Sequence, residues 1–250
     1  MAAIELYSTP LYTDINLVAY YRLESDGTDS KNSYPLTANG TVTFGTGEFG
    51  NAASFGTSGN SNSLRTTNTI GINGGVVSFV AWVKKNANLA SGKYSQAIYQ
   101  CNNSSMIEYR LGIDDASGTE KVDFTRGKIG VADNNAQIAE TWNVGDWHHL
   151  AGTYDGTNVL LYFDGTQVAT TTSTGNGSNS SVYSNGLSLG NNNNNSSFIQ
   201  NAFTVDDAAI FNRVLTATEI SNLYTGNWPV SFISRPNHTP LQAVNRASTY

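Results

Sequence analysis

Carboxylates in the middle of the chain are candidates for glycoside hydrolysis, which needs two carboxyl groups on opposite sides of the scissile bond. The nearest pairs are Glu120 with Asp123, and Glu108 with Asp114. On a strand, side chains on one face recur at every second residue. Neither pair has i, i+2 or i, i+4 spacing with a third acid on the same face. A hydrolase is therefore the least favoured of the functions considered below.

Two adjacent histidines, His148 and His149, follow Trp147 in a β-prone segment. Neighbouring side chains on a strand point to opposite faces, so the two rings cannot share a metal or a substrate. We expect them to pack and to form hydrogen bonds. Cys101 is the single cysteine, and no Cys and His spacing typical of zinc is present.

Sugar recognition needs planar rings beside amide or carboxylate groups, because a pyranose has an apolar face and a ring of hydroxyls. Aromatic and asparagine residues in the less regular segments suit that chemistry. The candidate ligand-binding residues are Tyr94, Tyr99, Trp142, Asn102, Asn103, Asn191 and Asn192. Among the aromatic candidates, Trp142 lies in the loop TWNVGD and is less obliged than Trp82 or Trp147 to be core.

Strands must position these residues. In residues 77–84 the bulky side chains alternate over both faces, which predicts a central strand covered on each side, with Trp82 packed. Residues 147–172 contain Asp155-Gly156 and Asp164-Gly165 between β-rich runs, which predicts a three-stranded meander with two tight turns. Weaker strands are expected from Gln96 to Phe124.

One short helix is predicted near the end of the chain. Thr216 and Glu219 have the spacing of a capping box, and Gly226 is a typical terminator. The segments at the two ends are less regular. Residues 1–15 are expected to form an edge strand or an arm, and residues 227–250, with three prolines, an extended arm.

Composition limits the class of protein. The chain has 250 residues, of which 13% are charged, and a formal net charge of −6. Gly, Asn, Ser and Thr are abundant, which favours strands and polar turns. The negative charge argues against nucleic acid as a partner, and no apolar run is long enough for a membrane span. We expect one all-β domain over residues 16–226.

Four segments in order resemble the LamG-like jelly-roll domains of the concanavalin A-like lectin and glucanase superfamily. They are LVAYYRLE with EFGNAASFG, then VSFVAWVK, then WHHLAGTYDGTNVLLYFDGTQVA, and VDDAAIFNRVLTATEISNLYTG. The resemblance implies a two-sheet antiparallel jelly-roll sandwich. The loop DSKNSYPLTANG after Asp29 departs from the family pattern and puts the geometry of that rim in doubt.

The same resemblance implies a calcium ion at the rim, because members of this superfamily often hold one there. The matching ligands are Asp29, which Asp26 could replace, and Asp206 or Asp207. Carboxylate and carbonyl oxygens suit this hard cation. The alternative is that Asp206 and Asp207 cap turns and meet solvent.

Two functions of different classes follow. The first is a non-catalytic recognition module that binds a glycan or a cell-surface partner through rim loops or a concave sheet face. The alternative is a structural or adhesion subunit of a large assembly, such as a virion surface or an extracellular filament, self-associating through residues 227–250. Either function predicts an extracellular or particle-surface location, although no signal peptide is visible.

Overall fold

The computed structural model describes most of the chain. The described residues are 4–56, 62–68, 70, 72, 75–100, 109–115, 118–127, 133–139, 142–173, 186–190 and 202–228.

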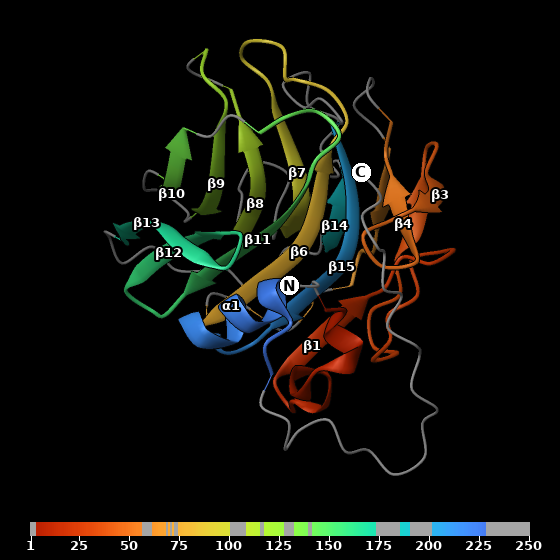
Figure 1. Ribbon diagram of the computed structural model, residues 1–250, viewed down its shortest axis with the longest axis horizontal. Helices are drawn as coiled ribbons and strands as arrows, with labels where there is room; N and C mark the ends of the chain where they lie inside the picture. The colour runs from red at the N-terminus through yellow and green to blue at the C-terminus, as the bar shows by residue number, and fades with distance from the viewer. Residues whose placement is uncertain are drawn as a thin grey trace, which may run out of the picture.

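Two antiparallel sheets pack face to face and form the predicted sandwich (Figure 1). The first has the order β13-β12-β11-β6-β15-β4-β3, with β1 also paired to β15. Its strands are β13 (Thr166–Thr172), β12 (Asn158–Phe163), β11 (Trp147–Tyr154), β6 (Val77–Lys85), β15 (Phe203–Phe211), β4 (Asn51–Ser54), β3 (Thr43–Thr46) and β1 (Leu17–Tyr21).

The second sheet has the order β10-β9-β8-β7-β14-β5-β2. Its strands are β10 (Asn134–Ala139), β9 (Lys121–Arg126), β8 (Tyr109–Asp114), β7 (Tyr94–Gln100), β14 (Leu187–Gly190), β5 (Ser63–Arg65) and β2 (Thr37–Asn39). The weak strands expected from Gln96 to Phe124 are therefore β7 to β9. β10 was not predicted, because its sequence NNAQIA has few strong β-formers.

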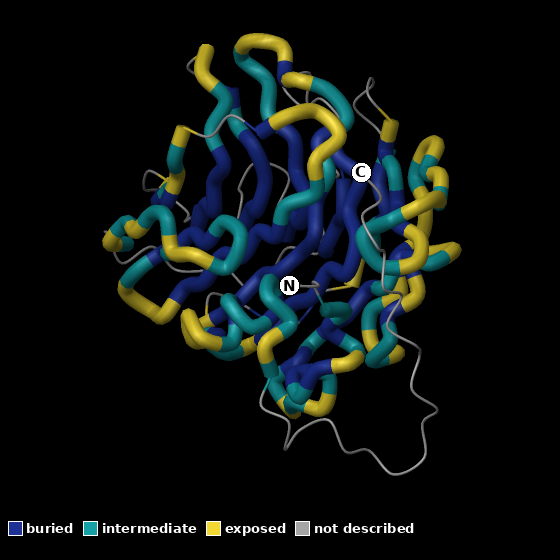
Figure 2. The backbone as a smooth tube through the Cα atoms, viewed as in Figure 1, coloured by how far each residue is buried: buried dark blue, intermediate teal, exposed yellow. Residues whose placement is uncertain are grey.

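Strand β6 is central and buried on both faces, as its alternation predicts. Phe79 points into the space between the sheets and meets Tyr109 and Phe124 at centroid distances of 5.7 and 5.8 Å. Trp82 lies on the opposite face and stacks on Tyr224 of the helix. In Figure 2 the strands are mostly buried, and most of the exposed residues lie in the connections between them.

A second apolar cluster covers the outer face of the first sheet. It joins Leu6 and Leu11 with Val80 of β6 and Ile220 and Leu223 of the helix. The N-terminal segment forms two 3-10 helices, η1 (Leu6–Ser8) and η2 (Pro10–Thr13), so the alternative of an edge strand is wrong. The leucines of this segment have more apolar surface to bury on the sheet face than at a sheet edge.

The three-stranded meander and the helix match their predictions. β11, β12 and β13 pair in sequence, and Gly156 and Gly165 take positive φ in the two turns. The helix α1 (Ala217–Thr225) begins at a complete capping box of Thr216 and Glu219 and ends at Gly226 in the left-handed conformation.

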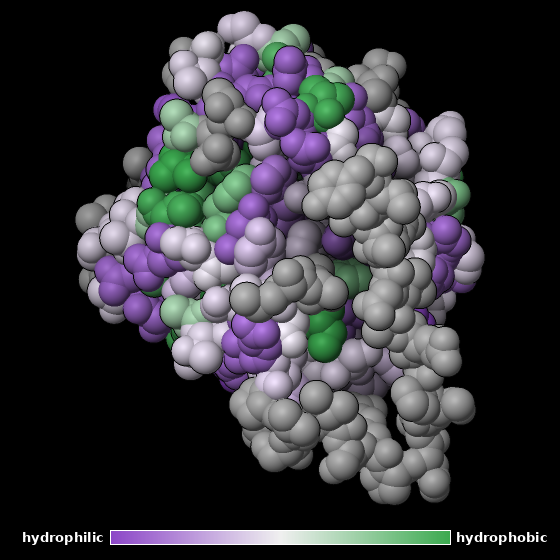
Figure 3. Space-filling model, viewed as in Figure 1, coloured by the Kyte–Doolittle hydropathy of each residue, from purple (hydrophilic) through white to green (hydrophobic). Residues whose placement is uncertain are grey.

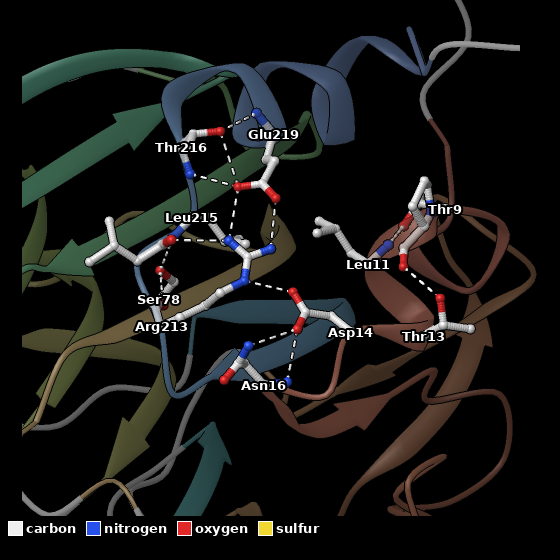
Figure 4. Close-up of polar contacts among 12 residues, drawn as sticks. Thr9, Leu11, Thr13, Asp14, Asn16, Ser78, Arg213, Leu215, Thr216 and Glu219 are labelled. Atoms are coloured by element: carbon white, nitrogen blue, oxygen red, sulfur yellow. Dashed lines mark hydrogen bonds and ion pairs between the residues drawn. The ribbon is translucent and has the colours of Figure 1, made fainter. Parts of the chain in front are cut away.

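Arg213 ties the N-terminal segment to the helix (Figure 4). Its Nε lies 2.6 Å from Oδ2 of Asp14, at the end of η2, and its Nη2 lies 2.6 Å from Oε1 of Glu219, in the first turn of α1. Ser78 adds a bridge, since its hydroxyl donates to the Arg213 carbonyl and accepts from the Leu215 N–H.

The predicted extended arm, residues 227–250, lies almost wholly outside the described residues, which end at Trp228. Within the described part of the chain, no helix combines the length and the apolar character that a membrane span requires.

Candidate functional site

A pocket of about 490 Å³ opens at one rim of the sandwich, where three loops meet. The loops join β6 to β7, β8 to β9, and β10 to β11, and they lie at the top of the view in Figure 1. The described lining residues are Lys85, Asn88, Leu89, Asp115, Gly118, Glu120, Trp142, Asn143 and Val144. At this end of the molecule Figure 3 shows hydrophilic and hydrophobic residues side by side.

Hydrogen bonds fix the loops of this rim pocket. The Asp115 N–H donates to the Lys93 carbonyl, and the Gly92 N–H donates to the Asp115 carbonyl. The Gly145 N–H donates to the carbonyl of Lys85 at 2.8 Å. The backbone of the pocket is therefore held in place without a ligand.

An ion pair forms part of the lining. Lys85 Nζ lies 2.7 Å from Glu120 Oε2, and the other carboxylate oxygen of Glu120 accepts the Leu89 N–H at 2.5 Å. The Lys85 side chain is only 3% exposed. Glu120 thus neutralises a lysine and holds the β6–β7 loop.

Two residues of the lining each carry a buried polar atom without a hydrogen-bond partner: Asp115 at Oδ1 and Trp142 at Nε1. Both residues are 7% exposed. A buried polar atom without a partner is costly, so each one calls for an explanation, such as a bound water or ion. The first is an acceptor and the second a donor, so a hydroxyl-bearing ligand suits the pair.

The expectation that Trp142 is a free loop aromatic is wrong. Its indole packs among Phe163, Phe203 and His148, and the His148 ring lies parallel to it at a centroid distance of 5.0 Å. His148 is held in turn by Asp164, at 2.8 Å. These apolar contacts bury the indole, so Trp142 has no free ring face.

The two histidines point to opposite faces, as predicted. His149 is buried beneath Trp82, at a centroid distance of 5.4 Å. Burial lowers the pKa of His149 to about 4, so the ring is neutral near pH 7.

Tyr94 and Tyr99 lie on strand β7 rather than in a loop. Tyr99 is 2% exposed, which contradicts its assignment as a loop aromatic. Tyr94 carries the Arg110 guanidinium over its ring at 5.0 Å. Both tyrosines belong to a polar row on the second sheet, because Tyr94 pairs with Asp114 and Tyr99 with Arg110.

The described acids of the predicted hydrolase pairs are held by bases. Asp114 and Asp123 both contact Nη2 of Arg110, at 3.0 and 2.6 Å, and Glu120 contacts Lys85. Glu108 lies outside the described residues, as do Asn102, Asn103, Asn191 and Asn192.

Each of the predicted calcium ligands accepts hydrogen bonds from its own surroundings. Asp29 accepts four backbone N–H groups, from Tyr20, Lys31, Ser33 and Tyr34, and so shapes its own loop. Asp26 accepts the Thr28 N–H. Among the described residues, no group of three acidic, histidine or cysteine side chains could hold a metal ion.

Asp206 and Asp207 occupy a bulge in β15 and are both buried. Asp207 accepts the Leu6 N–H and the Tyr20 hydroxyl, while Asp206 accepts the Phe49 N–H and leaves Oδ1 without a partner. Burial raises the pKa of Asp206 to about 8 and that of Asp207 to about 7. Both residues thus fasten neighbouring segments, and their burial shows that the alternative in which they meet solvent is wrong.

The sequence did not single out Lys85, Leu89 or Asp115 as site residues. The available signal was the Asp114-Asp115 doublet at the end of a strand, where alternation sends one carboxylate to the sheet face and the next to the other side. Only the meeting of three loops shows that Asp115 lies beside Glu120 and Trp142.

Known structures share this fold at low identity. Domain 4 of AbnA, a GH43 extracellular arabinanase from Geobacillus stearothermophilus, in complex with arabinotriose, matches with a TM-score of 0.65 and 17% identity, over 84% of this chain and 98% of that one. The binding domain of botulinum neurotoxin DC in complex with SialylT matches with a TM-score of 0.63 and 15% identity, over 85% of this chain. The receptor binding domain of botulinum neurotoxin type G matches with a TM-score of 0.61 and 17% identity, over 84% of this chain.

The chain spans about half of each toxin binding domain, 52% and 51%. Comparison with curated proteins gives no match. The family model Laminin_G_3, concanavalin A-like lectin/glucanases superfamily, matches residues 57–221, which is more than half of the chain. The predicted resemblance is therefore confirmed, and the chain belongs to the concanavalin A-like lectin/glucanase superfamily.

Proposed function

We propose that the protein is a non-catalytic carbohydrate-binding module whose ligand occupies the rim pocket. The observation that carries this proposal is the buried donor and acceptor without partners, Trp142 Nε1 and Asp115 Oδ1, in the lining of one open pocket. A sugar hydroxyl both donates and accepts hydrogen bonds, so adjacent hydroxyls satisfy both atoms.

The rest of the lining supports the same ligand class. Leu89, Val144 and the edge of Trp142 supply apolar surface for the C–H face of a sugar, and Asn88 and Asn143 supply amides at the mouth. The volume of about 490 Å³ lies in the range of small-molecule sites. Among the structural neighbours, the arabinanase domain was solved with arabinotriose.

The proposal is non-catalytic because the described acids of the candidate hydrolase pairs are held by bases. Glu120 binds Lys85, and Asp114 and Asp123 bind Arg110.

Isothermal titration against a panel of neutral oligosaccharides, arabinan, xylan, mannan and β-glucan fragments, tests the proposal. Trp142→Phe removes the indole N–H and keeps an aromatic ring, and we expect it to weaken binding by about five- to thirtyfold, the cost of one buried hydrogen bond. Trp82→Phe is the matched control, because Trp82 is buried to a similar degree and does not line the pocket.

Equal affinity of the Trp142→Phe variant and the parent would place the ligand elsewhere. No binding to any member of the panel, by a parent protein with a normal melting transition, would contradict the function itself.

Calcium stays a prediction that the described aspartates do not support. A thermal melt with and without chelator decides it, because an ion bound only by the folded protein raises the melting temperature. The assembly function also stays a prediction, since residues 229–250 lie outside the described part of the chain. Comparing the solution mass of the full chain with that of a chain ending at Trp228 tests it.

A further inference from the structure

Among the charged residues that line the rim pocket, Lys85 and Glu120 form an ion pair and Asp115 forms none with a described residue. We infer that the pocket selects neutral glycans against anionic ones, and that Asp115 is the specificity-determining residue. This inference rests on the proposed function, since it concerns the same pocket, and it names the class of sugar.

Lys85 is the one cation among the described lining residues. Its ammonium group is buried and contacts Glu120 at 2.7 Å. A ligand carboxylate or sulfate could recruit Lys85 only by breaking this pair, which would leave the Glu120 carboxylate in a partly buried place without a counter-ion. Breaking a buried ion pair in this way is strongly unfavourable.

Each carboxylate oxygen of Glu120 already accepts one hydrogen bond, one from Lys85 and the other from the Leu89 N–H. The Lys85 and Glu120 charges therefore cancel inside the lining. Both groups hold the pocket together and leave recognition to other residues.

Asp115 then supplies the excess charge. It forms no ion pair with any described residue, and its Oδ1 is buried without a hydrogen-bond partner. A ligand hydroxyl that donates to this carboxylate forms a charge-assisted hydrogen bond, which is about twice as strong as a neutral one. A ligand carboxylate at the same place meets a like charge in a poorly solvated site.

The indole N–H of Trp142 favours a neutral sugar over a cationic ligand. An ammonium group would satisfy Asp115 but cannot accept a hydrogen bond, so the indole N–H would stay without a partner. Hydroxyl groups satisfy both residues at once. The combination therefore favours a neutral, hydroxyl-bearing sugar unit.

The test uses pairs of oligosaccharides with the same linkage that differ only at C6, one with a hydroxymethyl group and one with a carboxylate. Titration of the intact chain should show the neutral member binding at least tenfold more tightly. Raising the salt concentration should strengthen binding of the anionic member and leave the neutral one unchanged, since salt screens the repulsion.

Asp115→Asn removes the charge and keeps the shape of the side chain. We expect it to narrow the neutral-to-anionic affinity ratio by at least tenfold, with weaker binding of the neutral sugar and stronger binding of the anionic one. Asp26→Asn is the control, because it makes the same change in net charge at an exposed residue in the loop after β1.

Equal binding of the two sugars by the parent, or tighter binding of the anionic one, would overturn the inference and leave the proposed function standing. Absence of binding to every sugar, neutral and anionic, would instead contradict the proposed function. The salt dependence and the parent ratio need no variant, so they decide the matter even if Asp115→Asn fails to fold.

Discussion

Two neighbouring histidines, His148 and His149, have different structural roles in this sandwich. His148 supports the indole of Trp142 by parallel stacking and is itself held by Asp164. His149, one residue on, faces the opposite side and is buried beneath Trp82. His148 therefore packs against a residue of the rim pocket, whereas His149 packs in an apolar interface on the other face of the sheet.

His149 should make stability depend on pH. Its pKa is about 4 in the folded protein, lowered by burial, against an ordinary value of 6.5. Between pH 4 and pH 6.5 the unfolded chain binds a proton at His149 that the folded chain does not bind. The contribution of neutral His149 to stability is therefore complete above pH 6.5 and is lost as the pH falls toward 4. We expect His149→Phe to lose less stability than the parent between pH 7 and pH 5, by on the order of 1–2 kcal/mol.

Urea unfolding of the parent and of His149→Phe at the two pH values measures this difference. Asp206 and Asp207 act in the opposite sense, because their raised pKa values make stability fall as the pH rises toward 7 and 8. Both aspartates are present in parent and variant, so their effect cancels in the comparison. Parallel pH profiles would show that His149 does not titrate as described.

At the scale of elements, the two sheets approach closely where β11 crosses β9. Gly152 of β11 faces the ring of Phe124, and a Cβ at Gly152 would lie 2.2 Å from that ring. No side chain larger than hydrogen fits there unless the Phe124 ring or the strands shift. The distance between the sheets is thus set in part by the absence of a side chain on β11.

Gly152→Ala should destabilise the fold by about 1–3 kcal/mol or more, since overpacking forces strands or rotamers to shift. Gly45→Ala is the matched control, because Gly45 also lies on a strand, β3, and a Cβ there meets nothing within 4 Å. We expect the control to be neutral or slightly stabilising. Similar melting temperatures for the two variants would contradict the close approach.

The element boundaries follow local chemistry where that chemistry is strong. The capping box of α1 and the Asp-Gly turns of the meander are predictable, because a side chain or a positive φ decides each of them within a few residues. Tyr99 is predicted less well, because its assignment as an accessible aromatic conflicts with its place within the weak strands expected from Gln96 onward. Pairing of β7 with β8 and β14 buries it in the second sheet.

For the whole molecule, the two ends of the described chain are fastened to one sheet by Arg213. Its guanidinium bridges Asp14 and Glu219, so η2 and α1 meet over the outer face of the first sheet. The contact joins residues about 200 positions apart in the sequence. These ion pairs connect the N-terminal segment and the helix, which both contribute residues to the second apolar cluster.

Arg213→Ala should cost about 1–3 kcal/mol and should loosen the N-terminal segment, because it leaves two partly buried carboxylates without their cation. A double-mutant cycle with Asp14→Ala should give a coupling energy above about 0.5 kcal/mol, as expected for residues in direct contact. Chemical unfolding and limited proteolysis within residues 4–15 measure the two effects. Additive variants with unchanged cleavage would show that the bridge contributes nothing.

The sequence alone determined the class of fold, the central strand β6, the β11–β13 meander and the capped helix, because each depends on alternation or turn chemistry within a short window. The family followed from the resemblance of four segments in order. The tertiary structure alone decided the site. Asp115, Glu120 and Trp142 line one pocket only because loops from both sheets converge at one rim, and the Glu120–Lys85 pair joins residues 35 positions apart. Burial and partner choice are properties of the folded whole, so no local pattern could predict which carboxylate would be left without an ion pair.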